Sequence, residues 1–179
     1  MTTGFFPVAQ GLYDPQYEHD ACGVGFVADL KNRKKHDIIR KAIQVLINLE
    51  HRGACGCEAN TGDGAGIVMQ TPDAFLRQEC ERLKIQLPAP GAYGVGMVFL
   101  PADPHDRQHC EDLFEYIARK QGQDVLGWRT VPTDNSQIGP TAKQAEPVMK
   151  QIFIGRKDRE VRVLGHDDLA FERRLFVIR

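Results

Sequence analysis

The spacing of apolar residues predicts a chain of mixed helices and strands. Helical spacing or helix-starting residues mark four segments: residues 37–49, 71–83, 103–121 and 167–179. Short apolar runs bounded by turn residues mark five strands: residues 23–30, 67–70, 94–100, 125–131 and 149–155. Because helical and extended segments follow one another along the chain, the pattern predicts an α/β or α+β fold.

Residues typical of helix starts set three of the helix boundaries. Asp37 is the expected N-cap of the first helix, and Thr71 is that of the second, with Pro72 at its first helical position. Asp103, followed by a proline, is expected to begin the third helix. The fourth helix is expected to present one apolar face, which carries Leu169, Phe171, Leu175 and Phe176.

Length and charge then limit the class of protein. The chain has 179 residues, of which 42% are hydrophobic, which is enough for a sizeable core and makes one domain the default. Lys and Arg total 23 against 24 for Asp and Glu, so no basic excess would attract a nucleic-acid backbone. The apolar runs are shorter than the roughly 20 residues that span a bilayer. We therefore expect neither a nucleic-acid partner nor a membrane.

The leader and the cysteines indicate the cytoplasm. No Lys or Arg precedes Lys31, and residues 13–20 are polar where a secretion signal needs an apolar stretch. The five cysteines are an odd number without a paired framework, which fits a reducing compartment. We therefore expect free thiols and a cytoplasmic protein.

Cys22 is the first candidate for chemistry, because it opens the apolar run of residues 23–30. Arg52 follows the first predicted helix, and a chain that turns back on itself would bring it beside this thiol. If the chain is cut between Ala21 and Cys22, one residue carries both a thiol nucleophile and an α-amine base. The alternative is an unreactive structural thiol, because free cysteine is among the most buried residues.

Three further motifs give weaker indications. The glycine-rich loop at residues 60–66 precedes a predicted strand, which argues against a dinucleotide or phosphate site and leaves a substrate-contacting turn or a simple turn. Cys55 and Cys57 form a single close pair, which is too little for a zinc site, so no metal is expected. His51 is interpreted as a packed or capping residue, and Asp63 as a turn former.

A family resemblance rests on motifs in the first 70 residues. They are YDP at residues 13–15 continuing to HDACGVGF at 19–26, LEHRGA at 49–54, and TGDGAGI at 61–67. With these motifs the chain resembles the amino-terminal part of the large subunit of bacterial glutamate synthase. The resemblance runs from about residue 12 to residue 179 and is strongest up to residue 70.

The resemblance implies a class II glutamine amidotransferase domain of the N-terminal-nucleophile hydrolase fold. The expected fold class is α+β, a four-layer αββα sandwich that is incomplete at its C-terminus. Residues 1–21 would be a propeptide, and residues 22–179 a partial amidotransferase domain. Removal of the propeptide would expose Cys22 as the catalytic nucleophile, with Arg52 as a substrate-binding residue. The implied reaction is hydrolysis of the glutamine amide to glutamate and ammonia, which the parent enzyme delivers to the amination of 2-oxoglutarate.

The resemblance also implies cofactors and partners. L-Glutamine is the expected substrate, and the remainder of the glutamate synthase large subunit is the expected partner, with a small subunit as an optional further one. No cofactor is expected in this chain, because FMN and an iron–sulfur cluster belong to later domains of the parent.

Two observations lead us to expect a truncated chain. The sequence stops inside an apolar pattern at residues 176–179. The family's oxyanion-hole Asn-Gly pair also has no match after Gly53, because neither Asn60 nor Asn135 precedes a glycine. One such donor is worth about 10²–10³ in rate, so the fragment alone is expected to be a weak or inactive enzyme. The competing hypothesis is a non-catalytic remnant or a partner-binding module of the same fold.

Overall fold

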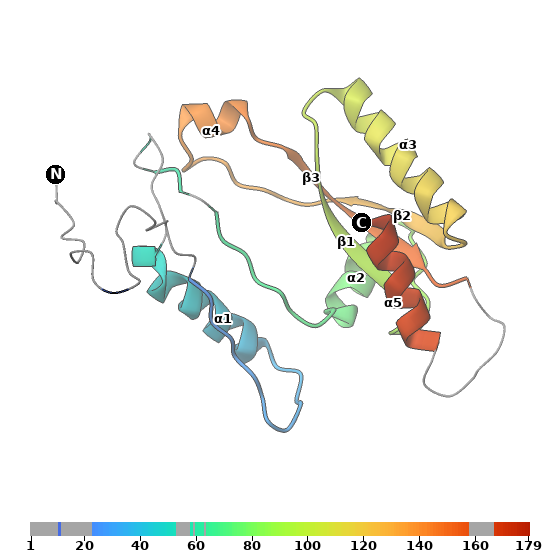
Figure 1. Cartoon of the computed structure of the whole chain (residues 1–179), viewed down its shortest axis with the longest axis horizontal. Coiled ribbons are helices and arrows are strands. Elements are labelled where there is room, and N and C mark those ends of the chain that lie inside the picture. The colour runs from blue at the N-terminus through green and yellow to red at the C-terminus, as the bar shows by residue number, and fades with distance from the viewer. Residues whose placement is uncertain (1–10, 12–22, 53–57, 59, 63, 158–166) are drawn as a thin grey trace. The chain divides into compact units, whose positions relative to one another are not determined.

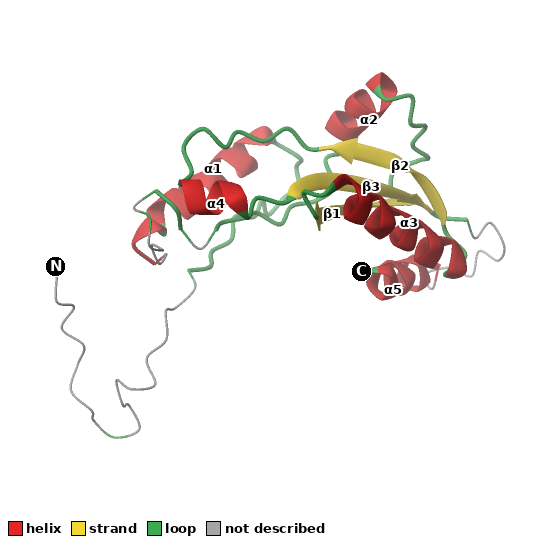
Figure 2. Ribbon diagram, turned by 90° about the horizontal axis from the view of Figure 1, so that it is seen from above, coloured by secondary structure: helices red, strands yellow, loops and turns green. Residues whose placement is uncertain are grey.

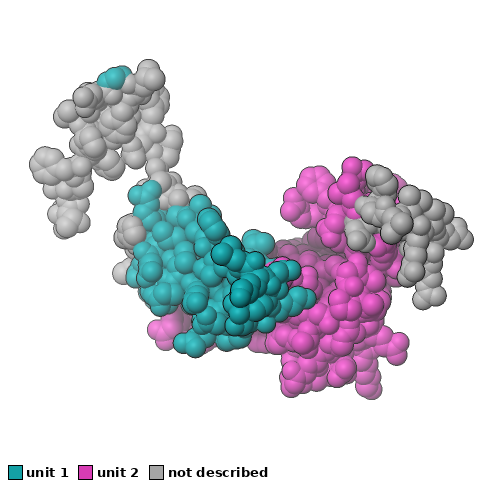
Figure 3. All heavy atoms as spheres, turned by 90° about the horizontal axis from the view of Figure 1, so that it is seen from below, with its two compact units in different colours: residues 1–69 teal, residues 70–179 magenta. Residues whose placement is uncertain are grey.

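The computed structural model describes residues 11, 23–52, 58, 60–62, 64–157 and 167–179. The chain divides into two compact units, Met1–Met69 and Gln70–Arg179, which are coloured teal and magenta in Figure 3. Arg52 and the glycine-rich loop belong to the first unit. The second unit contains the sheet (Figure 1).

The first unit contains an extended segment that leads into one long helix. Residues 23–29 are extended, and helix α1 spans His36–Asn48. A short 3₁₀ helix, η2, follows at Glu50–Arg52. The helix predicted over residues 37–49 is therefore confirmed.

The predicted N-cap of this helix is wrong. Lys35 occupies the N-cap position, and Asp37 lies in the first turn, where it pairs with Lys41 at 2.8 Å. An acidic side chain in the first turn is favoured both by the positive end of the helix dipole and by a cation four residues later. The signal at Asp37 was thus one of helix electrostatics rather than of capping.

The strands predicted over residues 23–30 and 67–70 are also wrong in the described part of the chain. Residues 23–29 and 65–70 belong to no strand ladder. An apolar run is typical of a buried strand, but the side chains of Val24, Phe26 and Leu30 are 93%, 92% and 102% exposed. A strand also needs a hydrogen-bonded neighbour, which lies elsewhere in the sequence.

The second unit alternates helices and strands and matches most predicted segments. In chain order its elements are α2 (Asp73–Arg82), β1 (Tyr93–Leu100), α3 (Pro104–Lys120), β2 (Asp124–Thr130), α4 (Pro140–Gln144), β3 (Val148–Gly155) and α5 (Asp167–Ile178). The helices α2, α3 and α5 and the three strands confirm the predictions for these stretches. The five-residue helix α4 was not predicted, because one turn is too short to show a period.

The three strands form an antiparallel sheet in the order β1-β3-β2 (Figure 2). The central strand β3 pairs along its length with β1, from Tyr93 opposite Gly155 to Leu100 opposite Val148. It pairs with β2 up to Thr130, with an irregularity in the register between Val125 and Gly127. Helices packed on an antiparallel sheet give the α+β class that the resemblance implied.

Side chains of alternate residues on β3 enter two separate cores. Phe153 is fully buried on the face that α2 covers, whereas Ile152 and Ile154 are buried on the face that α3 and α5 cover. This alternation follows from the two-residue period of a strand. Figures 1 and 2 show α3 and α5 beside each other on one face and α2 on the other.

Two boundary details of the second unit differ from prediction, and one agrees. Asp103 caps α3 as predicted, since its carboxylate accepts hydrogen bonds from the N–H groups of His105 and Asp106 at 2.9 and 3.0 Å. At α2 the N-cap is Pro72, so neither Thr71 nor Pro72 takes its predicted position. On α5 the predicted face is only half right. Phe171 is buried and Leu175 packs against the core, but Leu169 and Phe176 are 51% and 68% exposed.

The described residues contain no helix that is both long and apolar enough to cross a membrane. Within the second unit, the described layers are one helix, one sheet and two helices. The predicted four-layer αββα sandwich therefore stays a prediction.

Candidate active site

A tight turn folds the extended segment of the first unit back along α1. The Asp29 carboxylate accepts a hydrogen bond from the Lys31 N–H at 2.7 Å and forms an ion pair with Arg33 at 2.9 Å. Asn32 adopts a left-handed conformation, with φ at 51°, and its N–H donates to the Asp29 carbonyl at 2.8 Å. Asn and Asp favour such turns because their side chains bond to nearby backbone. The Arg33 guanidinium also holds the pKa of Asp29 below its ordinary value.

The segment then lies against α1 through two glycines. A Cβ atom placed on Gly25 would lie 2.6 Å from Val45 Cγ1. A Cβ atom placed on Gly23 would lie 3.1 Å from Leu49 Cδ2 and 3.2 Å from Arg52 Cβ. Only residues without a side chain allow this approach, so the Gly-Val-Gly pattern has a direct structural reason.

Arg52 is thereby brought next to Gly23, the residue that follows Cys22 in the sequence. The 3₁₀ turn holds it through an N–H bond to the Leu49 carbonyl at 2.8 Å. Its side chain is exposed, and among the described residues it has no hydrogen-bond or ion-pair partner. Cys22 itself lies outside the described residues. The catalytic role of Cys22 and the binding role of Arg52 stay predictions.

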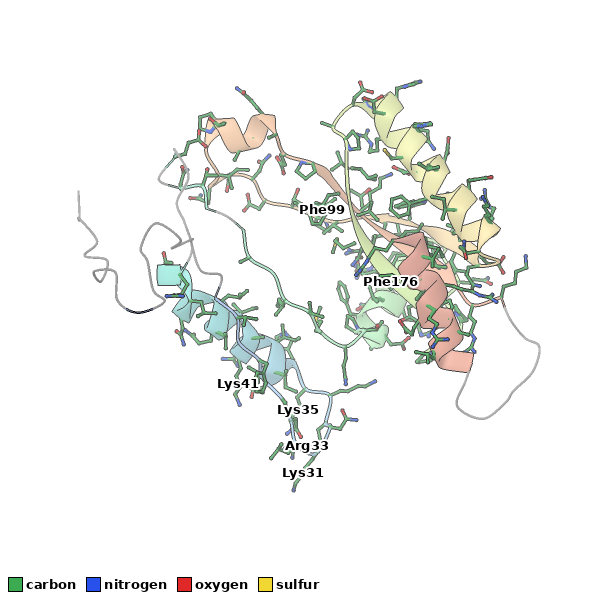
Figure 4. The ribbon with its side chains drawn as sticks, in the orientation of Figure 1. Lys31, Arg33, Lys35, Lys41, Phe99 and Phe176 are labelled. Atoms are coloured by element: carbon green, nitrogen blue, oxygen red, sulfur yellow. The ribbon has the colours of Figure 1, made fainter. Side chains whose placement is uncertain are left out.

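Several basic residues of the first unit lie near the end of α1 that is far from Arg52. Lys31, Arg33, Lys35 and Lys41 surround the turn before and at the start of this helix (Figure 4). Arg33 and Lys41 are each paired with an aspartate four residues earlier. Because Arg52 follows the opposite end of the helix, this basic turn is not part of the candidate site.

The remaining sequence candidates contribute little to the site as described. Cys55, Cys57 and Asp63 lie outside the described residues, as does the side chain of His51. Gly64 has a φ of 102°, which agrees with a turn in the glycine-rich loop.

The described cysteines and the one group of described side chains that could bind a metal lie in the second unit, whereas Arg52 belongs to the first. Cys80 and Cys110 are free thiols on α2 and α3, as the sequence predicted, and burial raises the pKa of Cys80. In the described part of the chain, three side chains could share a metal: Asp103, His105 and Asp106. All three are exposed, and the Asp103 carboxylate already caps α3.

Comparison with known proteins gives this arrangement a family. Residues 22–179 match the family described as glutamine amidotransferases class-II. The chain belongs to the class II glutamine amidotransferases. This match confirms the amidotransferase resemblance seen in the sequence, and it begins at Cys22.

Full-length relatives of this amidotransferase domain are glutamate synthases. The chain is 45% identical over 179 residues to the NADPH glutamate synthase large chain of Bacillus subtilis, covering all of this chain and 11% of that protein. It is 39% identical over 176 residues to the NADH glutamate synthase of Schizosaccharomyces pombe, covering 98% of the chain and 8% of that protein. It is 38% identical over 174 residues to the chloroplastic ferredoxin-dependent glutamate synthase 2 of Arabidopsis thaliana, covering 97% of the chain and 10% of that protein. The chain thus spans about a tenth of the length of these relatives.

The structure adds one set of contacts that was only partly visible in the sequence. Glycines at 23 and 25 permit another segment to approach closely, but the sequence alone does not identify that segment as the helix. The usable signal was the match between alternate glycines and the helical positions Val45, Leu49 and Arg52, which are spaced four and three residues apart.

Proposed function

We propose that residues 22–179 are the glutamine-hydrolysing part of a glutamate synthase, with Cys22 as the nucleophile and Arg52 as the anchor for the substrate carboxylate. The observation that carries the proposal is the exposed Arg52 side chain beside Gly23, which has no hydrogen-bond or ion-pair partner among the described residues. A guanidinium binds a carboxylate through two parallel N–H bonds. Glutamine offers such a carboxylate at one end and the amide to be cleaved at the other.

The reaction proceeds through a thioester after residues 1–21 are removed. The α-amine of Cys22 accepts the proton of the thiol, and the resulting thiolate attacks the side-chain amide carbon of glutamine. The amine returns that proton to the departing nitrogen, so ammonia leaves as the thioester forms. Water then adds to the thioester carbon, which releases glutamate and restores the thiol. An ordinary α-amine has a pKa of about 7.7–8.0, so roughly 10–20% of it is unprotonated at pH 7 and acts as base.

The same reasoning extends to the fold and the parent protein. We assign the three-stranded sheet to a four-layer αββα sandwich, which the family match supports. FMN and an iron–sulfur cluster are assigned to other parts of the parent glutamate synthase, which would use the ammonia to aminate 2-oxoglutarate. The partners in this proposal are the remaining large subunit and, where present, a small subunit. The free thiols of Cys80 and Cys110 support a cytoplasmic location.

The proposal is tested on the full polypeptide that the native gene encodes. Intact-mass spectrometry is expected to show a mature chain that begins at Cys22, and Cys22→Ala is expected to abolish glutamate release from glutamine. Arg52→Ala is expected to lower kcat/KM for glutamine about 10–100-fold, the value of one charge-assisted bond of about 1.5–3 kcal/mol. Arg40→Ala is the matched control, because Arg40 is exposed on α1, the helix that precedes the turn of Arg52.

Two results would contradict the proposal. Full activity in Cys22→Ala would exclude Cys22 as the nucleophile. Equal kcat/KM in Arg52→Ala and Arg40→Ala would exclude Arg52 as the anchor while leaving the nucleophile in place.

A further inference from the structure

Two residues of the extended segment cover nearly the same length as one turn of α1, against which the segment lies. Two residues of extended chain advance about 6.6 Å, and four residues of helix advance about 6 Å. Gly23 and Gly25 therefore meet Leu49 and Val45, which are one helical turn apart. Val24 lies between the two glycines, and its side chain is 93% exposed.

The Gly25 contact leaves no room for any side chain. The gap of 2.6 Å to Val45 Cγ1 is well below the roughly 3.5–4.0 Å of ordinary carbon contact. Val45 cannot rotate away, because a valine in a helix keeps one strongly preferred rotamer. A methyl group at position 25 would therefore push the segment and the helix apart by about 1 Å.

The Gly23 contact lies two residues along the same segment and depends on the same separation. A Cβ atom placed on Gly23 would lie 3.1 Å from Leu49 Cδ2 and 3.2 Å from Arg52 Cβ, so the Gly23 backbone lies close to both side chains and would move away from them when the segment moves off the helix. Leu49, which Gly23 approaches, has a half-buried side chain, so it would not follow the segment outward.

We infer that Gly25 and Val45 are positioning residues, whose contact sets the distance between Arg52 and the segment that begins at Gly23. The inference rests on the proposed function, in which Cys22 precedes Gly23 and Arg52 holds the substrate. Nucleophile and base belong to one residue, so a shift of the segment moves them together. The shift mainly weakens the contact between Arg52 and the carboxylate of a glutamine whose amide lies at Cys22, so it raises KM more than it lowers kcat.

The test compares four variants of the full polypeptide encoded by the native gene: Gly25→Ala, Val45→Ala, the double variant, and Ala28→Val. Gly25→Ala is expected to raise KM for glutamine about 10–100-fold and to change kcat much less, because a shift of about 1 Å breaks the charge-assisted bond between Arg52 and the substrate carboxylate. In the double variant the shortened residue 45 makes room for the new methyl group, so KM is expected to return to within about threefold of the parent value. Ala28→Val enlarges an exposed residue of the same segment and is expected to leave KM unchanged.

The rescue separates positioning from general damage to the fold. An unchanged KM in Gly25→Ala, or a double variant that is stable to urea but keeps the raised KM, overturns the inference. If Gly25→Ala does not fold, the comparison of the double variant with Val45→Ala decides the matter, because a raised KM in the folded double variant contradicts the inference and a normal KM supports it. If Cys22→Ala is active, the proposed function is refuted. If Cys22→Ala is inactive but Gly25→Ala has a normal KM, only the positioning role is refuted.

Discussion

Glu79 on α2 holds two arginines of very different exposure, which allows a sharp prediction about stability. Its Oε2 accepts a bond from Arg129 at 2.9 Å, and Arg129 is a side chain of β2 that is only 8% exposed. Its Oε1 accepts a bond from Arg82 at 2.7 Å, and that side chain is 66% exposed. Arg129 also donates to Gln151 at 3.0 Å and lies 5.6 Å over the Phe75 ring.

We expect Glu79→Ala to lower the free energy of unfolding by about 3 kcal/mol. A charge pair at 2.9 Å has a gross attraction of about 6 kcal/mol at an effective dielectric constant of 20. Removing one partner of a buried pair costs about 3–5 kcal/mol, because the other charge is left in the interior. The lower end applies here, since Glu79 is 20% exposed and Gln151 still binds the guanidinium.

Three control variants divide this effect into its parts. Arg82→Ala removes only the exposed pair and is expected to cost less than about 1 kcal/mol. Glu79→Gln keeps an acceptor oxygen and loses the charge, so about 2 kcal/mol is expected. Arg129→Met is expected to cost about 1 kcal/mol, because it removes the buried charge and leaves Glu79 paired with Arg82.

The assay is urea unfolding followed by the fluorescence of the single tryptophan. Trp128 precedes Arg129 on β2, and its ring meets Phe114 edge-on at a centroid distance of 6.1 Å, so its emission reports on the second unit. A loss of about 3 kcal/mol should lower the urea midpoint by about 1–3 M. An effect of Glu79→Ala equal to that of Arg82→Ala would refute the reasoning, because the Arg129 pair would then be worth no more than a surface pair.

Two further predictions concern the core of the second unit. Burial and the hydrogen bond to the Asp73 carboxylate at 2.8 Å raise the pKa of Tyr93 from 10.0 to about 12. The unfolded chain therefore loses this proton first, so stability should be constant below about pH 10 and fall as the pH rises towards 12. A tyrosine absorbance titration should show a late step that Tyr93→Phe removes, and a late step that persists in this variant would contradict the assignment. Phe153→Ala should cost about 3–5 kcal/mol in urea unfolding, because Phe153 is fully buried, and a loss below about 1 kcal/mol would contradict its place in the core.

Elements that depend on neighbouring residues were predictable from the sequence. The helix over residues 103–121 carries its own start signal in Asp103 and its own period, and it appears as α3 with that cap. The three strands of the sheet likewise appear within one residue of their apolar runs. Both signals act over a few residues, so no knowledge of the rest of the fold is needed.

Features that depend on distant residues were not predictable. The apolar run at 23–30 is extended but forms no ladder in the described chain, because pairing requires another segment. The face of α5 was partly misjudged, since helical spacing places Phe176 near the apolar stripe and only packing shows that it is 68% exposed. For the site, the sequence placed Arg52 near Cys22 as a hypothesis, and the structure describes the approach only from Gly23 onwards.

The sequence by itself determined the family and the residue types of the candidate chemistry, because motifs such as HDACGVGF and LEHRGA are read without coordinates. It also determined most helices and strands through local periods and caps. Only the tertiary structure decided that Gly25 lies against Val45 of α1, and Gly23 against Leu49 and Arg52, which follow this helix. The physical reason is that close packing joins residues about 20–30 positions apart, and such contacts leave no local pattern beyond the absence of a side chain.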